Sequence, residues 1–272
     1  CRELPGGQYL STYPTSEVPN FPIFYILHTN SHTTLTDQLI PNQTHGKMGI
    51  FKFLFKTTVY GAAGGAGAFA LWTRNSKFVE APSTDPLLSS ASYLKFNPNK
   101  NPILHDTCVR RVPLDKIKPH LLEKEGKLTE AFCAGVWSGL GYAYQRSYLA
   151  KKYQNDTTTA HQLWSRDELR SSTYEVGTEI TDHFQVLTKT PESIVVRCGD
   201  SPLKRDVRAS DGLFEMAAVV KKDEGVAEFK LTSVFYQGLG KATERPMPPH
   251  MEFLHRLYTK LWMETAIWNV EK

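Results

Sequence analysis

Cysteine is scarce in this chain of 272 residues, and its four copies lie far apart. Cys1, Cys108, Cys133 and Cys198 form no CxxC pair, which argues against a zinc knuckle. The wide spacing also differs from the dense disulfide framework of small secreted domains. We therefore expect reduced thiols that are mostly buried.

The sequence also lacks the motifs of the common nucleotide-dependent and hydrolytic enzymes. It has no G-x-S-x-G, no H-E-x-x-H, no G-x-x-x-x-G-K-[ST], and no G-x-G-x-x-G after a predicted strand. Its formal net charge is +4, and Lys and Arg are dispersed rather than gathered in a basic patch. We expect no nucleic-acid partner, no metal site and no cofactor.

Acidic residues are absent from residues 48–79, a region that is otherwise largely apolar. Its longest run, Thr57–Trp72, has 16 residues, whereas a membrane-spanning helix needs about 20. Phe53–Phe55 extend the run to about that length if the Lys56 side chain snorkels to the headgroups. Three interpretations compete: a transmembrane anchor over residues 53–72, part of a mitochondrial targeting region, or a flexible Gly/Ala linker or surface helix.

Polar segments flank this region on both sides. Residues 1–47 are rich in Pro, Thr, Asn and His and show no sustained periodicity, which predicts an irregular or disordered segment. One hypothesis makes Met48 the natural start of the protein. Residues 80–104 are rich in Pro, Ser and Asn and predict a linker or an extended surface arm.

Residues 105–272 carry the periodic patterns of a folded domain. Asp106–Val112 alternates as a first strand, and Asp115–Lys124 is a short helix candidate. Leu128–Tyr153 is helical, with internal glycines that mark either a break or a close crossing by the sheet. Tyr174–Val186 alternates with a period of two, as a strand with one buried face does.

The remaining pattern predicts more strands and one long helix. The strands are Ser193–Cys198, Leu213–Lys221 and Ala227–Tyr236. In Met251–Val270 the apolar residues recur at spacings of three and four, which indicates a helix with one buried face. Together these strand and helix patterns predict an α+β fold, in which a curved antiparallel sheet packs around a long C-terminal helix.

This order of elements resembles the helix-grip fold of the SRPBCC superfamily, which includes START domains, plant pathogenesis-related class 10 proteins and polyketide-cyclase-like proteins. The likeness rests on Asp167–Arg170 leading into Val176–Val186, on Gly225–Phe235, and on the closing helix with His255-Arg-Leu-Tyr. It implies an apolar cavity between sheet and helix over residues 105–272. Members of the superfamily bind lipids, sterols, polyketides or other apolar molecules, and some are cyclases, but they share no universal catalytic residues.

Polar residues on faces expected to be apolar are the candidates for chemistry. Thr178 and Asp182 share the predicted buried side of the strand Tyr174–Val186, whereas His183 points to the surface. A buried carboxylate must be paired or protonated, so Asp182 is a candidate acid, base or ligand anchor. The alternative is a bulge or an edge position that puts Asp182 in water.

Further candidates lie on the first strand, in a turn and on the closing helix. Arg110, if it faces inwards, either holds a ligand carbonyl or carboxylate or forms a salt bridge to Asp182, Glu179 or Glu215. His255 is either a second catalytic residue or a structural histidine. Asp211 and Gly212 predict a hairpin turn. Aromatic residues either fill the core or line a pocket: Phe214, Phe229, Phe235, Tyr258 and Trp262.

Three functions follow from these patterns. The first is a membrane-anchored binding domain for a hydrophobic small molecule or lipid. The second is a cyclase-, isomerase- or dehydratase-type enzyme in which Asp182 assists proton transfer in the same cavity. The third is a structural or assembly protein whose interior is filled by its own side chains.

Overall fold

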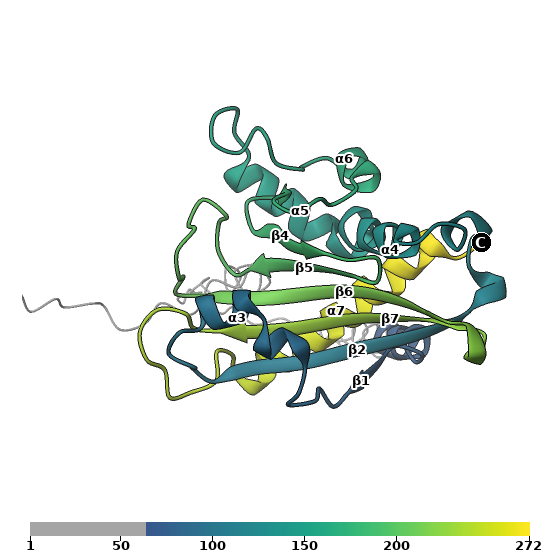
Figure 1. Ribbon diagram of the computed structural model, residues 1–272, viewed down its shortest axis with the longest axis horizontal. Coiled ribbons are helices and arrows are strands. Elements are labelled where there is room, and N and C mark those ends of the chain that lie inside the picture. Colours follow the sequence, from purple (N-terminus) through teal and green to yellow (C-terminus); the bar gives the residue numbers. More distant parts are fainter. Residues whose placement is uncertain (1–63) are drawn as a thin grey trace, which may run out of the picture.

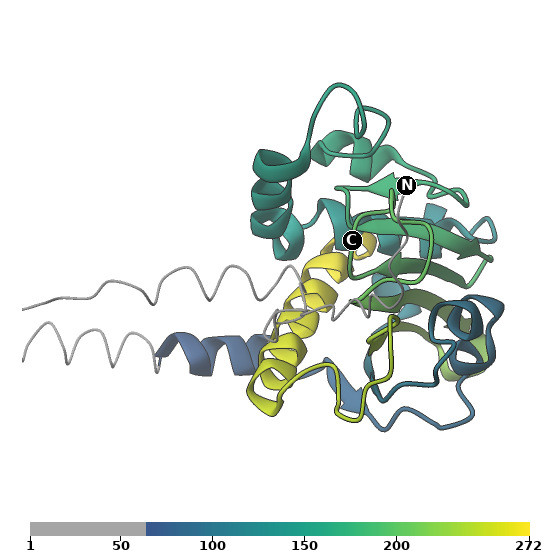
Figure 2. The same cartoon turned by 90° about the vertical axis from the view of Figure 1, so that its left-hand side faces the viewer.

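The structure is a computed structural model, and it describes residues 64–272. Within that range one antiparallel sheet of seven strands has the order β1-β2-β7-β6-β5-β4-β3 (Figure 1). The strands are β1 (Lys77–Val79), β2 (Ile103–Pro113), β3 (Glu179–Ile180), β4 (Phe184–Lys189), β5 (Ser193–Cys198), β6 (Asp211–Lys221) and β7 (Val226–Tyr236). The fold is therefore α+β, and the sheet curves around the long C-terminal helix (Figure 2).

Helices cover the two faces of the sheet unequally. The α-helices are α3 (Ala91–Phe96), α4 (Lys127–Ser138), α5 (Leu140–Tyr153), α6 (Arg166–Ser171) and α7 (Pro249–Val270). Short 3-10 turns span Pro86–Ser89, Leu114–Lys116, Pro119–Leu121 and Lys222–Glu224. The helices α4 and α7 lie behind the sheet in Figure 1 and α3 lies in front of it. The main core therefore forms between the sheet and the α4–α7 layer.

Side chains on the central strands point alternately to the two faces of the sheet, so these strands contribute to two hydrophobic cores. On β6, Phe214 and Met216 face the main core, whereas Leu213 faces a smaller core under α3. Residues 80–104, expected to be a linker or surface arm, contribute Leu87 and Phe96 to that smaller core. Successive side chains of a strand point to opposite faces, so one apolar strand serves both layers.

The prediction of one continuous strand over Tyr174–Val186 is wrong. Only Glu179–Ile180 and the residues from Phe184 onward are extended. Between them Thr181 and Asp182 have left-handed backbone angles, φ 49° and 55°, which turn the chain back on itself. The apolar residues Ile180 and Phe184 on either side of this turn keep the period of two, but the turn residues Thr181, Asp182 and His183 are all polar, so polarity does not reveal the turn.

Two predicted helices also differ from the structure. Asp115–Lys124 forms two separate 3-10 turns rather than a helix, because Pro119 lacks the backbone N–H that a continuous helix would need. Leu128–Tyr153 is divided at Gly139 into α4 and α5. A Cβ at Gly135 would lie 2.6 Å from the carbonyl oxygen of Ala266, so α7, and not the sheet, crosses this region closely.

The apolar segment before the domain is described only in part. Residues 64–72 are helical, and residues 1–63, which include most of the predicted anchor, lie outside the described residues. From residue 64 onward no helix is both long and apolar enough to span a bilayer. The three cysteines of the described chain are unpaired and buried, as predicted, and burial raises the pKa of the Cys108 thiol to about 12.

Candidate functional site

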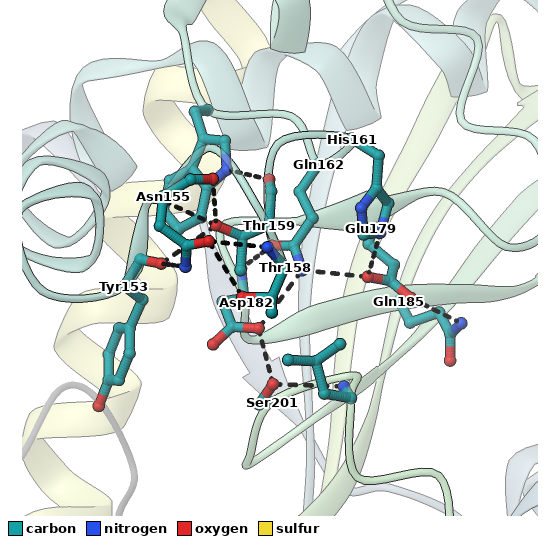
Figure 3. Close-up of polar contacts among 12 residues, drawn as sticks. Tyr153, Asn155, Thr158, Thr159, His161, Gln162, Glu179, Asp182, Gln185 and Ser201 are labelled. Atoms are coloured by element: carbon teal, nitrogen blue, oxygen red, sulfur yellow. Dashed lines mark hydrogen bonds and ion pairs between the residues drawn. The ribbon is translucent and has the colours of Figure 1, made fainter.

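Three loops meet at Asp182, at the end of the sheet where β3 turns into β4 (Figure 3). The Asp182 Oδ1 atom accepts hydrogen bonds from Ser201 Oγ at 2.6 Å and from Gln162 Nε2 at 3.3 Å. The backbone N–H of Asp182 donates to Gln162 Oε1 at 2.6 Å. The Gln162 amide thus binds both the side chain and the backbone of one buried residue.

A second carboxylate shares the same amide. Gln162 Nε2 also donates to Glu179 Oε2 at 3.0 Å, and His161 Nε2 lies 3.0 Å from the same oxygen. Gln185 Nε2 contacts Glu179 Oε1 at 3.5 Å (Figure 3). Asp182 and Glu179 are therefore bridged by a neutral donor, which lets both carboxylates stay close together.

The loop over residues 154–165 holds Gln162 in place. The Asn155 side chain accepts from the backbone N–H groups of Thr157 and Thr158, and the Trp164 indole donates to the Thr159 carbonyl at 2.9 Å. Ser165 and Glu168 then form a reciprocal capping box at the start of α6. The site is built on an ordered hydrogen-bonded loop.

His183 is buried next to this site, with 8% of its surface exposed, so the prediction that it points to the surface is wrong. Its ring packs on Tyr153, with the ring centroids 5.2 Å apart, and within residues 64–272 its Nδ1 atom has no hydrogen-bond partner. Burial lowers the pKa of the imidazole, although Asp182, a Thr181 backbone contact and Asp200 partly offset this effect.

The buried imidazole predicts how stability depends on pH. An unfolded chain binds a proton at the ordinary pKa of about 6.5, whereas folded His183 resists protonation, so the free energy of unfolding falls as pH drops below about 7. We expect the urea midpoint to decrease between pH 7.5 and 5.5, and His183→Gln to flatten that decrease. His120→Gln is the control because His120 is exposed. Equal pH dependence in both variants would exclude His183 as the cause.

The Asp182 turn connects directly to the aromatic interior. The hydroxyls of Tyr142 and Thr181 are hydrogen-bonded to each other, and both residues are fully buried. The Tyr142 ring lies 5.2 Å from Trp137 and 5.4 Å from Trp262, centroid to centroid. Burial raises the pKa of Tyr142, so its hydroxyl stays protonated and can donate a hydrogen bond.

Aromatic side chains of α4, α7 and β6 form a cluster between α7 and the sheet. Trp262 contacts Trp137, Phe214 and Tyr258, with centroid distances of 5.5, 5.6 and 5.1 Å. In the described part of the chain the indole N–H groups of Trp137 and Trp262 have no hydrogen-bond partner. The Trp137 indole lies near the Cys133 thiol and the Trp262 indole near the Tyr258 hydroxyl, one turn earlier on the same helix, and each indole acts to lower the pKa of its neighbour. Neither contact has the distance and angle of a hydrogen bond.

Of the aromatic residues that were predicted to line a pocket, some lie in this cluster and others lie elsewhere in the fold. Phe214, Tyr258 and Trp262 come together in it, as just described. Phe229 packs instead on Phe132, at 4.9 Å between centroids. Phe235 packs on His255, at 5.1 Å.

The polar candidates are also separated. Thr178 lies in the loop before β3, where its backbone N–H bonds the Glu175 carbonyl. His255 Nε2 lies 3.3 Å from Asp106 Oδ1 on β2. No contact in the described range joins His255 to Asp182, so the two proposed catalytic residues belong to different polar groups.

Arg110 faces α7, but its partner differs from the carboxylates considered in the sequence. Its Nε atom lies 3.6 Å from Glu264 Oε1, which also accepts a hydrogen bond from Ser76 Oγ at 2.6 Å. The predicted salt bridge from Arg110 to Asp182, Glu179 or Glu215 is therefore wrong. The interpretation of Asp211 as part of a hairpin turn is also wrong, because Asp211 begins β6 and pairs with buried Arg197.

Gln162 and Ser201 could not be predicted from the sequence, because an amide and a hydroxyl in polar loops match no motif and their partners are distant in the chain. Compared with family models, curated proteins and solved structures, the chain gives no match. Chemically, the arrangement offers buried donors among aromatic rings, next to a carboxylate whose Oδ1 atom is already hydrogen-bonded.

Proposed function

We propose that the chain is a membrane-tethered, helix-grip-type binding domain for an apolar small molecule or lipid that carries a hydrogen-bond acceptor. The observation that supports this most is the pair of unpartnered indole N–H groups, Trp137 and Trp262, inside the aromatic cluster of the described domain. Buried donors without acceptors are rare in folded proteins, and each needs an explanation. A bound carbonyl, ether or hydroxyl oxygen would supply the missing acceptor.

The order and pairing of the elements support the helix-grip interpretation. A strand, β2, precedes two helices, α4 and α5; antiparallel strands follow, and α7 closes the chain. The first of these strands, β2, pairs with the last, β7, along eleven residues, so the two ends of this order lie side by side in the sheet. In a helix-grip domain we expect the ligand between the sheet and the closing helix, and the two indoles lie between the sheet and α7.

The energetics favour an apolar ligand with few polar groups. The rings of Trp137, Phe214 and Trp262 contact one another in this region, and removing apolar area from water contributes about 25 cal/mol per Å². Hydrogen bonds to the two indoles would add orientation rather than most of the affinity. The tether is proposed for the apolar run over residues 53–72, which leads directly into the domain.

The enzyme alternative is less well supported by the contacts of Asp182. Its Oδ1 atom is engaged by Ser201 and Gln162, and its backbone by Gln162, so a role in holding three loops together accounts for its burial. His255, the second catalytic candidate, is engaged with Asp106. We therefore assign Asp182 a positioning role at the edge of the aromatic interior.

Native mass spectrometry of the purified full chain tests the binding function. We expect an apolar molecule to co-purify, and Trp262→Phe to weaken its retention about tenfold, because the indole hydrogen bond is lost while an aromatic ring remains at this position. Trp164→Phe is the matched control, since the Trp164 indole already donates to the Thr159 carbonyl. A chain that carries no ligand after mild purification and binds none from a lipid extract would contradict the proposal.

A further inference from the structure

We infer that the domain lies on an anionic bilayer through the face formed by the residue 64–72 helix, the C-terminal turns of α7 and the start of α5. This inference rests on the proposed membrane tether and specifies how the tethered domain is oriented. The occupant of this face is a lipid surface.

The residue 64–72 helix is apolar and exposed. None of its side chains carries a charge, and residues 64–68 are all exposed although they are glycine and alanine. Leu71 is 64% exposed. The helix projects from the body of the molecule on the side of α7, whereas α3 lies on the opposite side (Figure 2). An apolar helix that leaves a folded domain without covering it is suited to lipid rather than water.

The attachment of this helix to the domain is short and specific. The Trp72 ring packs on Trp268 of α7, with the centroids 5.3 Å apart. Four residues later, Ser76 Oγ donates to buried Glu264 Oε1 at 2.6 Å, and β1 then pairs with β2. Because the chain is fixed to α7 and to the sheet so soon after the helix, the domain cannot rotate freely about its tether.

The side chains around the exit of the helix suit the bilayer interface. Trp268 is 52% exposed beside Trp72, and tryptophan is enriched at the level of lipid headgroups. On α5, which lies on the same side of the molecule (Figure 2), Leu140 is 68% and Tyr144 66% exposed. These residues add exposed apolar and amphipathic surface on the side of the molecule from which the helix projects.

The charges around this face favour contact with an anionic membrane over contact with a protein surface that carries both signs of charge. Residues 48–79 and the whole of α5 contain no acidic residue, Arg74 and Lys77 follow the helix, and Glu264 on the C-terminal half of α7 is buried. Basic residues close to an anionic leaflet are attracted to it. The same apolar run continues in the sequence before residue 64, as expected if the helix enters lipid.

Quenching by brominated lipids tests this orientation. The full chain is reconstituted in phosphatidylcholine–phosphatidylglycerol vesicles with brominated acyl chains, and tryptophan emission is measured. Of the five tryptophans, Trp137, Trp164 and Trp262 are buried in the domain. We expect quenching of the other two, Trp72 and Trp268. Trp268→Phe should remove about half of the quenched emission, since one of two interfacial indoles is lost. Trp164→Phe, the control, should leave the quenched emission unchanged.

The outcomes separate the parts of the proposal. A chain that stays bound to vesicles while Trp268→Phe leaves the quenched emission unchanged overturns the docking face but not the tether. A chain that does not bind vesicles at all overturns both, and the ligand measurement above is independent of either. If Trp268 contacts a second copy instead, quenching is absent and Trp268→Ala converts a dimer to a monomer in sedimentation. The thermal midpoint of each variant verifies that it folds.

Discussion

Arg197→Ala should lower the free energy of unfolding by about 3–5 kcal/mol, because it leaves the buried Asp211 carboxylate without its partner. Arg197 Nε and Nη2 donate to the two oxygens of Asp211 at 2.9 and 2.6 Å, and only 2% of the Arg197 side chain is exposed. The guanidinium also donates to the carbonyls of Arg205 and Asp206 and lies 3.5 Å from the Phe96 ring centre. It therefore joins the residue 199–210 loop and α3 to the sheet.

At the Asp211 carboxylate the cost of burial and the attraction of the neighbouring arginines oppose each other. Burial raises the pKa of Asp211 even though Arg197 and Arg208 act to lower it. Such a pair contributes little net stability, yet losing one partner is severe. The double variant Arg197→Met with Asp211→Leu should therefore be much less destabilised than Arg197→Ala.

The control for this prediction is a surface ion pair in the same loop. Lys204 Nζ lies 2.7 Å from Asp200 Oδ2, with the lysine side chain 66% exposed. Lys204→Ala should change the free energy of unfolding by at most about 0.5 kcal/mol. Urea denaturation measures all three variants, with the slope checked for constancy. An effect of Arg197→Ala as small as that of Lys204→Ala would contradict the assigned role.

Gly135→Ala is expected to destabilise the fold by about 1–3 kcal/mol, although alanine is the better helix former. The added Cβ would lie 2.6 Å from the Ala266 carbonyl oxygen and 2.9 Å from Asn269 Cβ, so α7 would have to move away from α4. Thermal unfolding should show a lower midpoint. The same displacement should weaken ligand retention, because Trp137 and Trp262 lie on these two helices.

Gly67→Ala is the matched control for this substitution. No atom lies within 4 Å of the position of its added Cβ, so it should leave stability unchanged or raise it slightly. A Gly135→Ala variant that is as stable as Gly67→Ala would mean that α4 and α7 are not packed as closely as described.

Strong periodicity explains which parts of the fold the sequence predicts. The strands β5, β6 and β7 and the helix α7 begin within two residues of the positions expected from alternation or from three-and-four spacing. Each has a largely apolar buried face, so burial determines its conformation. The α+β class and the closing helix follow from these elements alone.

The errors arise where a tertiary contact overrides the local pattern. Thr181 and Asp182 take left-handed angles that no alternation reveals, and their turn is held by Gln162 and Tyr142 from other elements. The pairing of Arg197 with Asp211 is equally invisible, since a turn-forming Asp-Gly pair gives no hint of a buried arginine. For the site, the aromatic residues of α7 were predictable from helical spacing, whereas the polar loops around Asp182 were not.

The indole region of a ¹H–¹⁵N spectrum of the full chain tests the ligand-binding claim most directly, because each of the five tryptophans gives one side-chain N–H signal. A long-chain methyl ester serves as the probe, since it places a carbonyl acceptor on an apolar chain. The account predicts that the Trp137 and Trp262 signals move downfield on titration while that of Trp164 stays in place. It would be contradicted if Trp137 and Trp262 stayed unchanged across a panel of apolar acceptors.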